Sequence, residues 1–150
     1  MMLSQAAVGA ETTTFTVMAQ FAPSCTVSAE PLSFGSNIPT PVTVPVYSTS
    51  AITAQCSASV PYSVLLGAGT GPTATPALRQ MRAGGNLLTY TIYEDAARTR
   101  IWGDGTVGTV VSTITGTGAP QTLTAFGSVG AGQAPGIGLY TDTVTVAVVF

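Results

Sequence analysis

Residues 140–150 alternate between apolar side chains and polar or small ones. One face collects Val144, Val146, Val148 and Phe150, and the opposite face collects Thr141, Thr143, Thr145, Ala147 and Val149. A period of two with many β-branched residues predicts a β-strand that has one strongly apolar face. Each edge of a strand needs a neighbour or some protection. No turn or returning strand follows Phe150, so we expect an earlier part of the chain, or another chain, to cover at least one edge.

A second alternating stretch lies near the start of the chain, at residues 12–21. Phe15, Val17, Ala19 and Phe21 share one face, and Thr14, Thr16, Met18 and Gln20 share the other. Pro23 ends the pattern, because proline has no N–H to give to a strand ladder. The stretch is predicted to be an amphipathic strand with two roles open to it. It is either the first strand of the domain or the strand that another copy lacks.

Between these stretches, the sequence predicts short strands separated by turns rich in glycine and proline. The expected segments are 25–34, 52–56, 61–66, 79–82, 87–93, 106–117 and 121–127, with 38–47 as a proline-interrupted edge and 67–76 and 130–138 as Gly-rich loops. Residues 94–98 alone tolerate a helical turn. Trp102 either caps the core or anchors a partner. The pattern favours an all-β fold, an antiparallel β-sandwich of about eight or nine strands.

Composition narrows the class of function. Charged residues make up 7% of the 150 residues and hydrophobic ones 45%, and the net charge is −2. This leaves no basic footprint for nucleic acid or anionic lipid. A surface of Thr, Ser, Gly and Ala has little charge to keep copies apart, which fits a protein packed against copies of itself. An ordinary secreted domain of low charge is the alternative.

The sequence holds no obvious catalytic machinery. Without His or Lys, the usual nucleophile–base arrangement has no base. The six acidic residues are scattered, and nothing marks a catalytic pair across a cleft. We therefore expect no enzyme, no cofactor and no metal ion.

The two cysteines, Cys25 and Cys56, are separated by 31 positions, which is not redox or metal-ligand spacing. A structural disulfide is favoured over two buried free thiols. Such a bond would add roughly 3–4 kcal/mol by loop closure. It would also indicate an oxidising compartment.

Residues 1–10 are apolar, uncharged and end in small side chains, with Val8 and Ala10 at the −3 and −1 positions of a cleavage before Glu11. They are interpreted as a signal-peptide remnant or a flexible N-terminus. No stretch is long enough to span a membrane.

An ordered set of short motifs then resembles a known family. The set is Cys25-Thr-Val, Leu32-Ser-Phe-Gly35, Cys56, Pro61-Tyr62, Arg79-Gln-Met81, Leu88-Thr-Tyr-Thr-Ile-Tyr-Glu-Asp95, Arg98, Trp102-Gly-Asp-Gly105, Phe126-Gly127 and Gly138-Leu-Tyr-Thr-Asp142. Together these motifs resemble the spore coat protein U domain family, which includes shaft subunits of archaic, Csu-type chaperone–usher pili. The resemblance covers residues 12–150.

The resemblance implies an incomplete immunoglobulin-like sandwich that lacks its last strand and takes a donor strand from another subunit. Residues 25–150 would be the pilin domain, and 11–24 the donor-strand extension. The family's disulfide maps onto Cys25–Cys56. The donor's plug residues would be Phe15, Val17, Ala19 and Phe21, and the acceptor-groove strand would present Val144, Val146, Val148 and Phe150. Ala19 is small for a plug, which implies a shallow pocket there.

The implied function is a structural subunit of a surface pilus that polymerises by donor-strand exchange and serves adhesion and biofilm formation. Its partners would be identical or related pilins, joined head to tail, and a periplasmic chaperone and an outer-membrane usher during assembly. The protein would pass through the periplasm to the cell surface. Two alternatives stay open: a secreted spore-coat-type structural protein, and an adhesin or carbohydrate-binding module.

Overall fold

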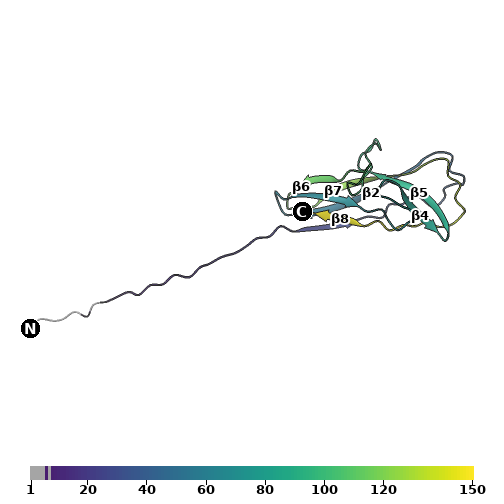
Figure 1. Ribbon diagram of the computed structural model, residues 1–150. Helices are drawn as coiled ribbons and strands as arrows, with labels where there is room; N and C mark the ends of the chain where they lie inside the picture. The colour runs from purple at the N-terminus through teal and green to yellow at the C-terminus, as the bar shows by residue number, and fades with distance from the viewer. Residues whose placement is uncertain (1–5, 7) are drawn as a thin grey trace, which may run out of the picture.

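The computed structural model describes residue 6 and residues 8–150, which form an all-β sandwich with a long N-terminal tail (Figure 1). The strands are β1 (Cys25–Ala29), β2 (Val46–Cys56), β3 (Pro61–Leu66), β4 (Arg79–Ala83), β5 (Asn86–Tyr93), β6 (Ser112–Thr115), β7 (Gln121–Val129) and β8 (Val146–Val149). This part of the chain contains no helix, and residues 94–98 form a bend and turn. The predicted all-β class is confirmed.

The strands form two antiparallel sheets. One sheet has the order β1-β2-β7-β5-β4, and the other has the order β6-β3-β8. The long strand β2 pairs with β7 from Val46↔Val129 to Ala54↔Gln121. In the smaller sheet, β3 lies between β6 and β8. Strands β1 and β8 are therefore edge strands of different sheets.

The core fills the space between the sheets. Tyr62, Val64 and Leu66 of β3 are each at most 1% exposed, as the alternation of that strand predicts. Trp102 is 0% exposed, and its Nε1–H donates a hydrogen bond to the Val64 carbonyl (2.9 Å). Of the two roles considered for the tryptophan, the structure supports the core residue.

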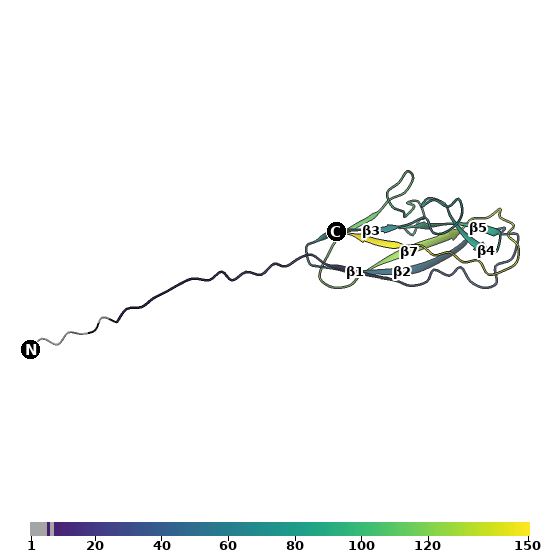
Figure 2. The ribbon, with the colours of Figure 1, turned by 60° about the horizontal axis from the view of Figure 1, so that its bottom comes forward.

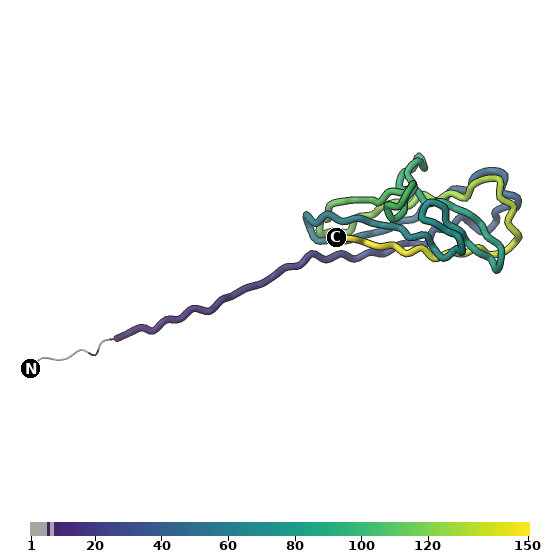
Figure 3. The backbone as a smooth tube through the Cα atoms, in the orientation of Figure 1, coloured from purple at the N-terminus to yellow at the C-terminus, as the bar shows by residue number. Residues whose placement is uncertain are grey.

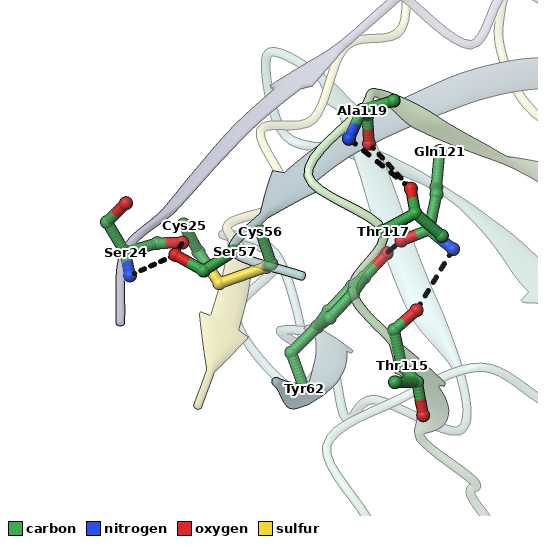
Figure 4. The surroundings of a disulfide bond; sticks show 9 residues. All are labelled: Ser24, Cys25, Cys56, Ser57, Tyr62, Thr115, Thr117, Ala119 and Gln121. Carbon is green, nitrogen blue, oxygen red and sulfur yellow. Dashed lines mark hydrogen bonds between the residues drawn. A yellow bond between two sulfur atoms is a disulfide. The ribbon is translucent and has the colours of Figure 1, made fainter. Parts of the chain in front are cut away.

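A disulfide joins Cys25 to Cys56, so the cysteines are not free thiols. The two residues face each other in the β1–β2 register. Figure 4 shows the bond beside Ser24 and Ser57, where the Ser24 N–H donates a hydrogen bond to the Ser57 hydroxyl oxygen (3.0 Å). The bond therefore ties the first strand to the end of the second.

Strand β2 begins at Val46, which is earlier than the predicted start at residue 52. Its first half was missed because Ser48 and Ser50 interrupt the apolar pattern. Their hydroxyl groups donate hydrogen bonds to the carbonyls of Ser33 and Glu30, so these polar side chains are satisfied within the fold. A strand position that carries such a bond needs no apolar residue.

The proline-rich segment expected at 38–47 forms a strand only from Val46 onward. The part of the segment before β2 is instead hydrogen-bonded to the second Gly-rich loop. The Val42 N–H donates to the Gln133 carbonyl (2.8 Å), and the Val42 carbonyl accepts from the Gly132 N–H (2.8 Å). Val42 is 3% exposed, so the segment covers one end of the core. The strand expected over 106–117 is likewise shorter and covers only Ser112–Thr115.

Within one copy, residues 12–21 form no strand, so the first of their two predicted roles, the first strand of the domain, is wrong. They belong to an extended tail that leaves the sandwich beside the C-terminal end of β8 (Figure 3). Every residue from 8 to 24 is exposed. A strand needs a neighbour for its backbone groups, and the tail has none within the described residues. The predicted signal remnant, residues 1–10, includes 1–5 and 7, which lie outside the described residues.

Candidate functional site

Strand β8 pairs along one edge only. Its residues Val146–Val149 pair with β3, and the Gly67 N–H extends this edge by donating to the Thr145 carbonyl (2.9 Å). Successive residues of a strand turn their backbone groups to opposite edges. Residues 145, 147 and 149 therefore face β3, whereas 144, 146 and 148 face the other way. In the described part of the chain, no strand pairs with this second edge.

Strand β1, an edge strand of the larger sheet, lies opposite this free edge of β8. The Glu30 N–H donates to the Ala51 carbonyl (2.9 Å), so the even-numbered residues of β1 bond to β2. Cys25, Val27 and Ala29 turn their backbone groups toward β8. The two edge strands lie side by side, with Cα atoms that approach within 8 Å of one another (Figures 1 and 2). Two strands with a third strand paired between them stand about 10 Å apart. Strands β1 and β8 must therefore move slightly apart before an added strand can pair between them.

The border opens into a cavity at the end away from the C-terminus. The cavity has a volume of about 390 Å³. Its apolar lining comes from strands of both sheets and from the segments after β1 and before β8, and it includes Leu32, Phe34, Ile52, Leu66, Met81 and Val144. A dry cavity of about 150 Å³ suffices to bind benzene, so this one has room for an aromatic side chain. We call this cavity, with the free edges of β1 and β8, the open border.

A second hollow of about 700 Å³ adjoins the first, and Leu32, Phe34, Met81 and Tyr140 line both. It lies between residues 32–42 and 135–140. The proline-rich segment and the second Gly-rich loop form its walls. The open border therefore continues past the point where β1 ends.

The residues predicted for an acceptor strand divide into two groups. Val144, Val146 and Val148 are half-buried and pack against the core. Phe150 is 56% exposed, although it shares their face in the sequence pattern. The strand itself is shorter than the predicted 140–150, because β3 pairs only with Val146–Val149.

The carboxylate of Asp142 holds in place the part of the cavity wall that precedes β8 in the sequence. Asp142 accepts hydrogen bonds from the Tyr90 hydroxyl (2.6 Å), the Thr70 N–H (2.8 Å) and the Thr70 hydroxyl (2.9 Å). Burial, followed by the bond to Asp142, raises the pKa of Tyr90, so the phenol stays a proton donor. The network ties the segment before β8 to β5 and to the loop after β3.

Arg79 of β4 pairs with Tyr90 in the β4–β5 register and is 0% exposed. Its Nε–H donates to the Gly67 carbonyl (2.8 Å), and Nη2 donates to the carbonyls of Leu66 (3.2 Å) and Trp102 (2.9 Å). Desolvation by burial lowers the pKa of the guanidinium, and the nearby Tyr90, Asp142 and Asp104 offset only part of that shift. Arg79 therefore joins β3, β4 and the tryptophan loop. The sequence analysis did not predict Arg79 or Asp142 as site residues. Their presence in the family motifs was the one feature of the sequence that pointed to them.

The tail residues predicted as plugs lie outside the open border. Phe15 is 85% exposed, Val17 81% and Phe21 95%, and Ala19 is exposed as well. One copy of the chain therefore does not bring the predicted donor and acceptor residues together. Within the described residues, the tail and the second edge of β8 each keep backbone groups that pair with no strand.

No group of three or more His, Cys, Asp or Glu residues among the described ones could hold a metal ion. In the same part of the chain, no helix is long and apolar enough to cross a membrane.

Two features define the class of fold: two antiparallel layers arranged as in an immunoglobulin-like sandwich, and a border that lacks a strand. The matching protein family is described as Spore Coat Protein U domain, and the match spans residues 11–147. The chain therefore belongs to the spore coat protein U domain family.

Two known proteins are similar to it. Protein U of Myxococcus xanthus is 33% identical over 129 aligned residues, which cover 79% of this chain and 71% of that protein. The second is a chain from a crystal structure of the CsuC–CsuE chaperone–tip adhesion subunit pre-assembly complex of archaic chaperone–usher Csu pili from Acinetobacter baumannii. It matches with 25% identity and a TM-score of 0.60 over 86% of this chain. The match spans only 40% of that longer chain.

Proposed function

We propose that the protein is a structural subunit of a chaperone–usher pilus that polymerises by donor-strand exchange. The open border is the observation that carries this proposal. It combines unpaired backbone groups on β1 and β8 with an apolar cavity between the sheets. Both needs are met by one added strand with alternating apolar side chains.

The donor in this proposal is the tail of a second copy. Phe15, Val17, Ala19 and Phe21 enter the open border of the next subunit, and Val144, Val146, Val148 and Phe150 form the strand that receives them. The backbone groups of residues 144, 146 and 148 accept and donate the new ladder bonds. Because donor and acceptor are different surfaces, the contact is heterologous and does not close, so it generates a filament.

Assembly of such a filament requires that the open border be protected before the donor arrives. A periplasmic chaperone fills this role in our proposal, and an outer-membrane usher then exports the subunit to the cell surface. The similar solved chain comes from a chaperone–subunit complex of Csu pili, which supports these partners. The disulfide fits the oxidising periplasm. Adhesion and biofilm formation would be the role of the finished pilus.

A secreted coat protein is the second candidate, because the name of the family refers to the spore coat and Protein U is a relative. Such a protein could use the same strand addition without a pilus. Electron microscopy of material sheared from cells separates the two, since only the first predicts thin filaments that contain this chain.

A matched pair of substitutions tests donor-strand exchange. Phe15→Asp places a charge on the face that enters the apolar cavity, and Thr16→Asp places the same charge on the opposite face. Burying an unpaired carboxylate is strongly unfavourable. We therefore expect Phe15→Asp to abolish filaments and Thr16→Asp to leave them largely intact, by electron microscopy and by sedimentation. Equal loss in both variants would show that the assigned face is wrong.

A further inference from the structure

The tail and the open border of one copy meet at the same end of the molecule. The tail departs next to the C-terminal end of β8, at one mouth of the border (Figures 1 and 2). A segment tethered by a short linker experiences its own binding site at an effective concentration of around 1 mM. Free copies rarely reach that concentration. Insertion of the tail into its own border would therefore compete strongly with assembly, unless the fold prevents it.

The last residues of the tail are fixed in direction. The Ser24 N–H donates to the Ser57 hydroxyl oxygen (3.0 Å), and the Ser57 N–H donates to the Ser24 carbonyl (3.0 Å). The adjacent Cys25 is tied to Cys56 by the disulfide (Figure 4). Ser24 thus extends the line of β1 outward, away from the border.

The next two residues continue that line. The ring of Pro23 fixes its φ near −65°. It also disfavours the helical region for Ala22, so that residue stays extended. Residues 22–24 therefore form a stiff spacer. In Figure 3, the tube of the tail continues away from the sandwich at this end of the molecule.

Self-insertion would require the chain to reverse direction ahead of this spacer. A tight reversal takes about 2–5 residues. Placed before Ala22, it would use Phe21 and its neighbours as loop, which removes one aromatic plug from the inserted part. The reversed tail would also run parallel to β8, a pairing that is slightly weaker per residue than the antiparallel one.

We propose that the spacer of residues 22–24, held by Ser57 and the disulfide, is a device that prevents the tail from entering its own border and so reserves it for a second copy. This inference rests on the proposed donor function of the tail. It assigns to Pro23 and Ser57 a role in choosing between intramolecular and intermolecular insertion.

Chymotrypsin provides the test, because it cleaves after the exposed Phe15 and Phe21 of a free tail. The full chain is refolded with its disulfide intact, separated into monomer and oligomer by gel filtration, and digested, with mass spectrometry of the products. One variant combines Pro23→Gly with Ser57→Ala. A second inserts four glycines between Pro23 and Ser24, and so leaves the Ser24–Ser57 bonds in place. The control combines Pro72→Gly with Thr124→Ala, two exposed positions that lie outside both the spacer and the open border.

We expect the tail of the wild-type and control monomers to be cleaved rapidly, and the tail of both variant monomers to be cleaved about tenfold more slowly. Cleavage of a transiently open segment follows its open population, so this factor corresponds to a tail inserted about nine-tenths of the time. Oligomers of the variants should decline correspondingly. Rapid cleavage in the variant monomers, or a protected tail in the wild-type monomer, would overturn the device. If tails in wild-type oligomers are cleaved as rapidly as in monomers, the proposed donor function itself is wrong.

Discussion

Moving residues 12–21 to a position after Phe150, through a linker of about four glycine and serine residues, should let one molecule fill its own open border. The rearranged chain lacks the original tail, so the transferred segment is its only donor. Here the linker turns the donor antiparallel to β8, whereas a tail inserted from its natural place would run parallel to that strand. The product is expected to be a monomer that is more stable than the parent.

The magnitude follows from one side chain in two settings. In the parent monomer, Phe15 is 85% exposed, so Phe15→Ala should change the free energy of unfolding by less than about 0.5 kcal/mol. In the rearranged chain, the same ring lies between the sheets, where a Phe→Ala change costs about 3–5 kcal/mol. For a domain of this size, that loss lowers Tm by roughly 6–20 °C.

The assay is thermal and urea unfolding of four proteins, the parent and the rearranged chain with and without Phe15→Ala, followed by circular dichroism. The parent is kept dilute enough to remain monomeric. Thr16→Ala in both backgrounds is the control, because Thr16 lies on the face that points to solvent in either arrangement. A cost of Phe15→Ala that is the same in the parent and the rearranged chain would refute the filling of the border. So would a rearranged chain that melts with the parent.

Two further predictions concern the frame of the open border. Replacing both Cys25 and Cys56 by Ala should lower the free energy of unfolding by roughly 3–4 kcal/mol through the lost loop closure, and urea titration should match that loss when the wild type is reduced with dithiothreitol. A much smaller loss would mean that the β1–β2 pairing is stable without the disulfide. Tyr90→Phe removes the hydrogen bond to Asp142 and should cost about 1.5–3 kcal/mol in the same titration, whereas no change would show that Thr70 alone satisfies the carboxylate.

Periodicity predicted the fold class because most strands bury one face only. Strands β3 and β5 follow the alternation closely, and both were expected at nearly their observed bounds. The first half of β2 escaped prediction because Ser48 and Ser50 satisfy their hydroxyls on backbone carbonyls that lie far away in the sequence. No local pattern records such a bond.

The candidate site was only partly visible in the sequence. The inward face of Val144, Val146 and Val148 could be predicted, since alternation fixes which side chains share a face. The lining from Leu32 and Phe34 could not, because these residues follow β1 in a stretch without regular pairing. Burial of Arg79 was also hidden, because its hydrogen-bond partners are backbone carbonyls, which every residue has.

The tail shows that an alternating pattern alone does not make a strand within one copy. Residues 12–21 carry alternation as regular as that of β3, yet they form no strand, whereas β3 has two neighbours. The side-chain pattern records which face a segment buries when it is paired, but the pairing itself depends on a second backbone. In this chain, the unpaired pattern and the unpaired edge of β8 lie at the same end of the molecule, and the direction of residues 22–24 keeps them apart. In the proposed exchange, this complementarity serves the contact between two copies rather than a contact within one.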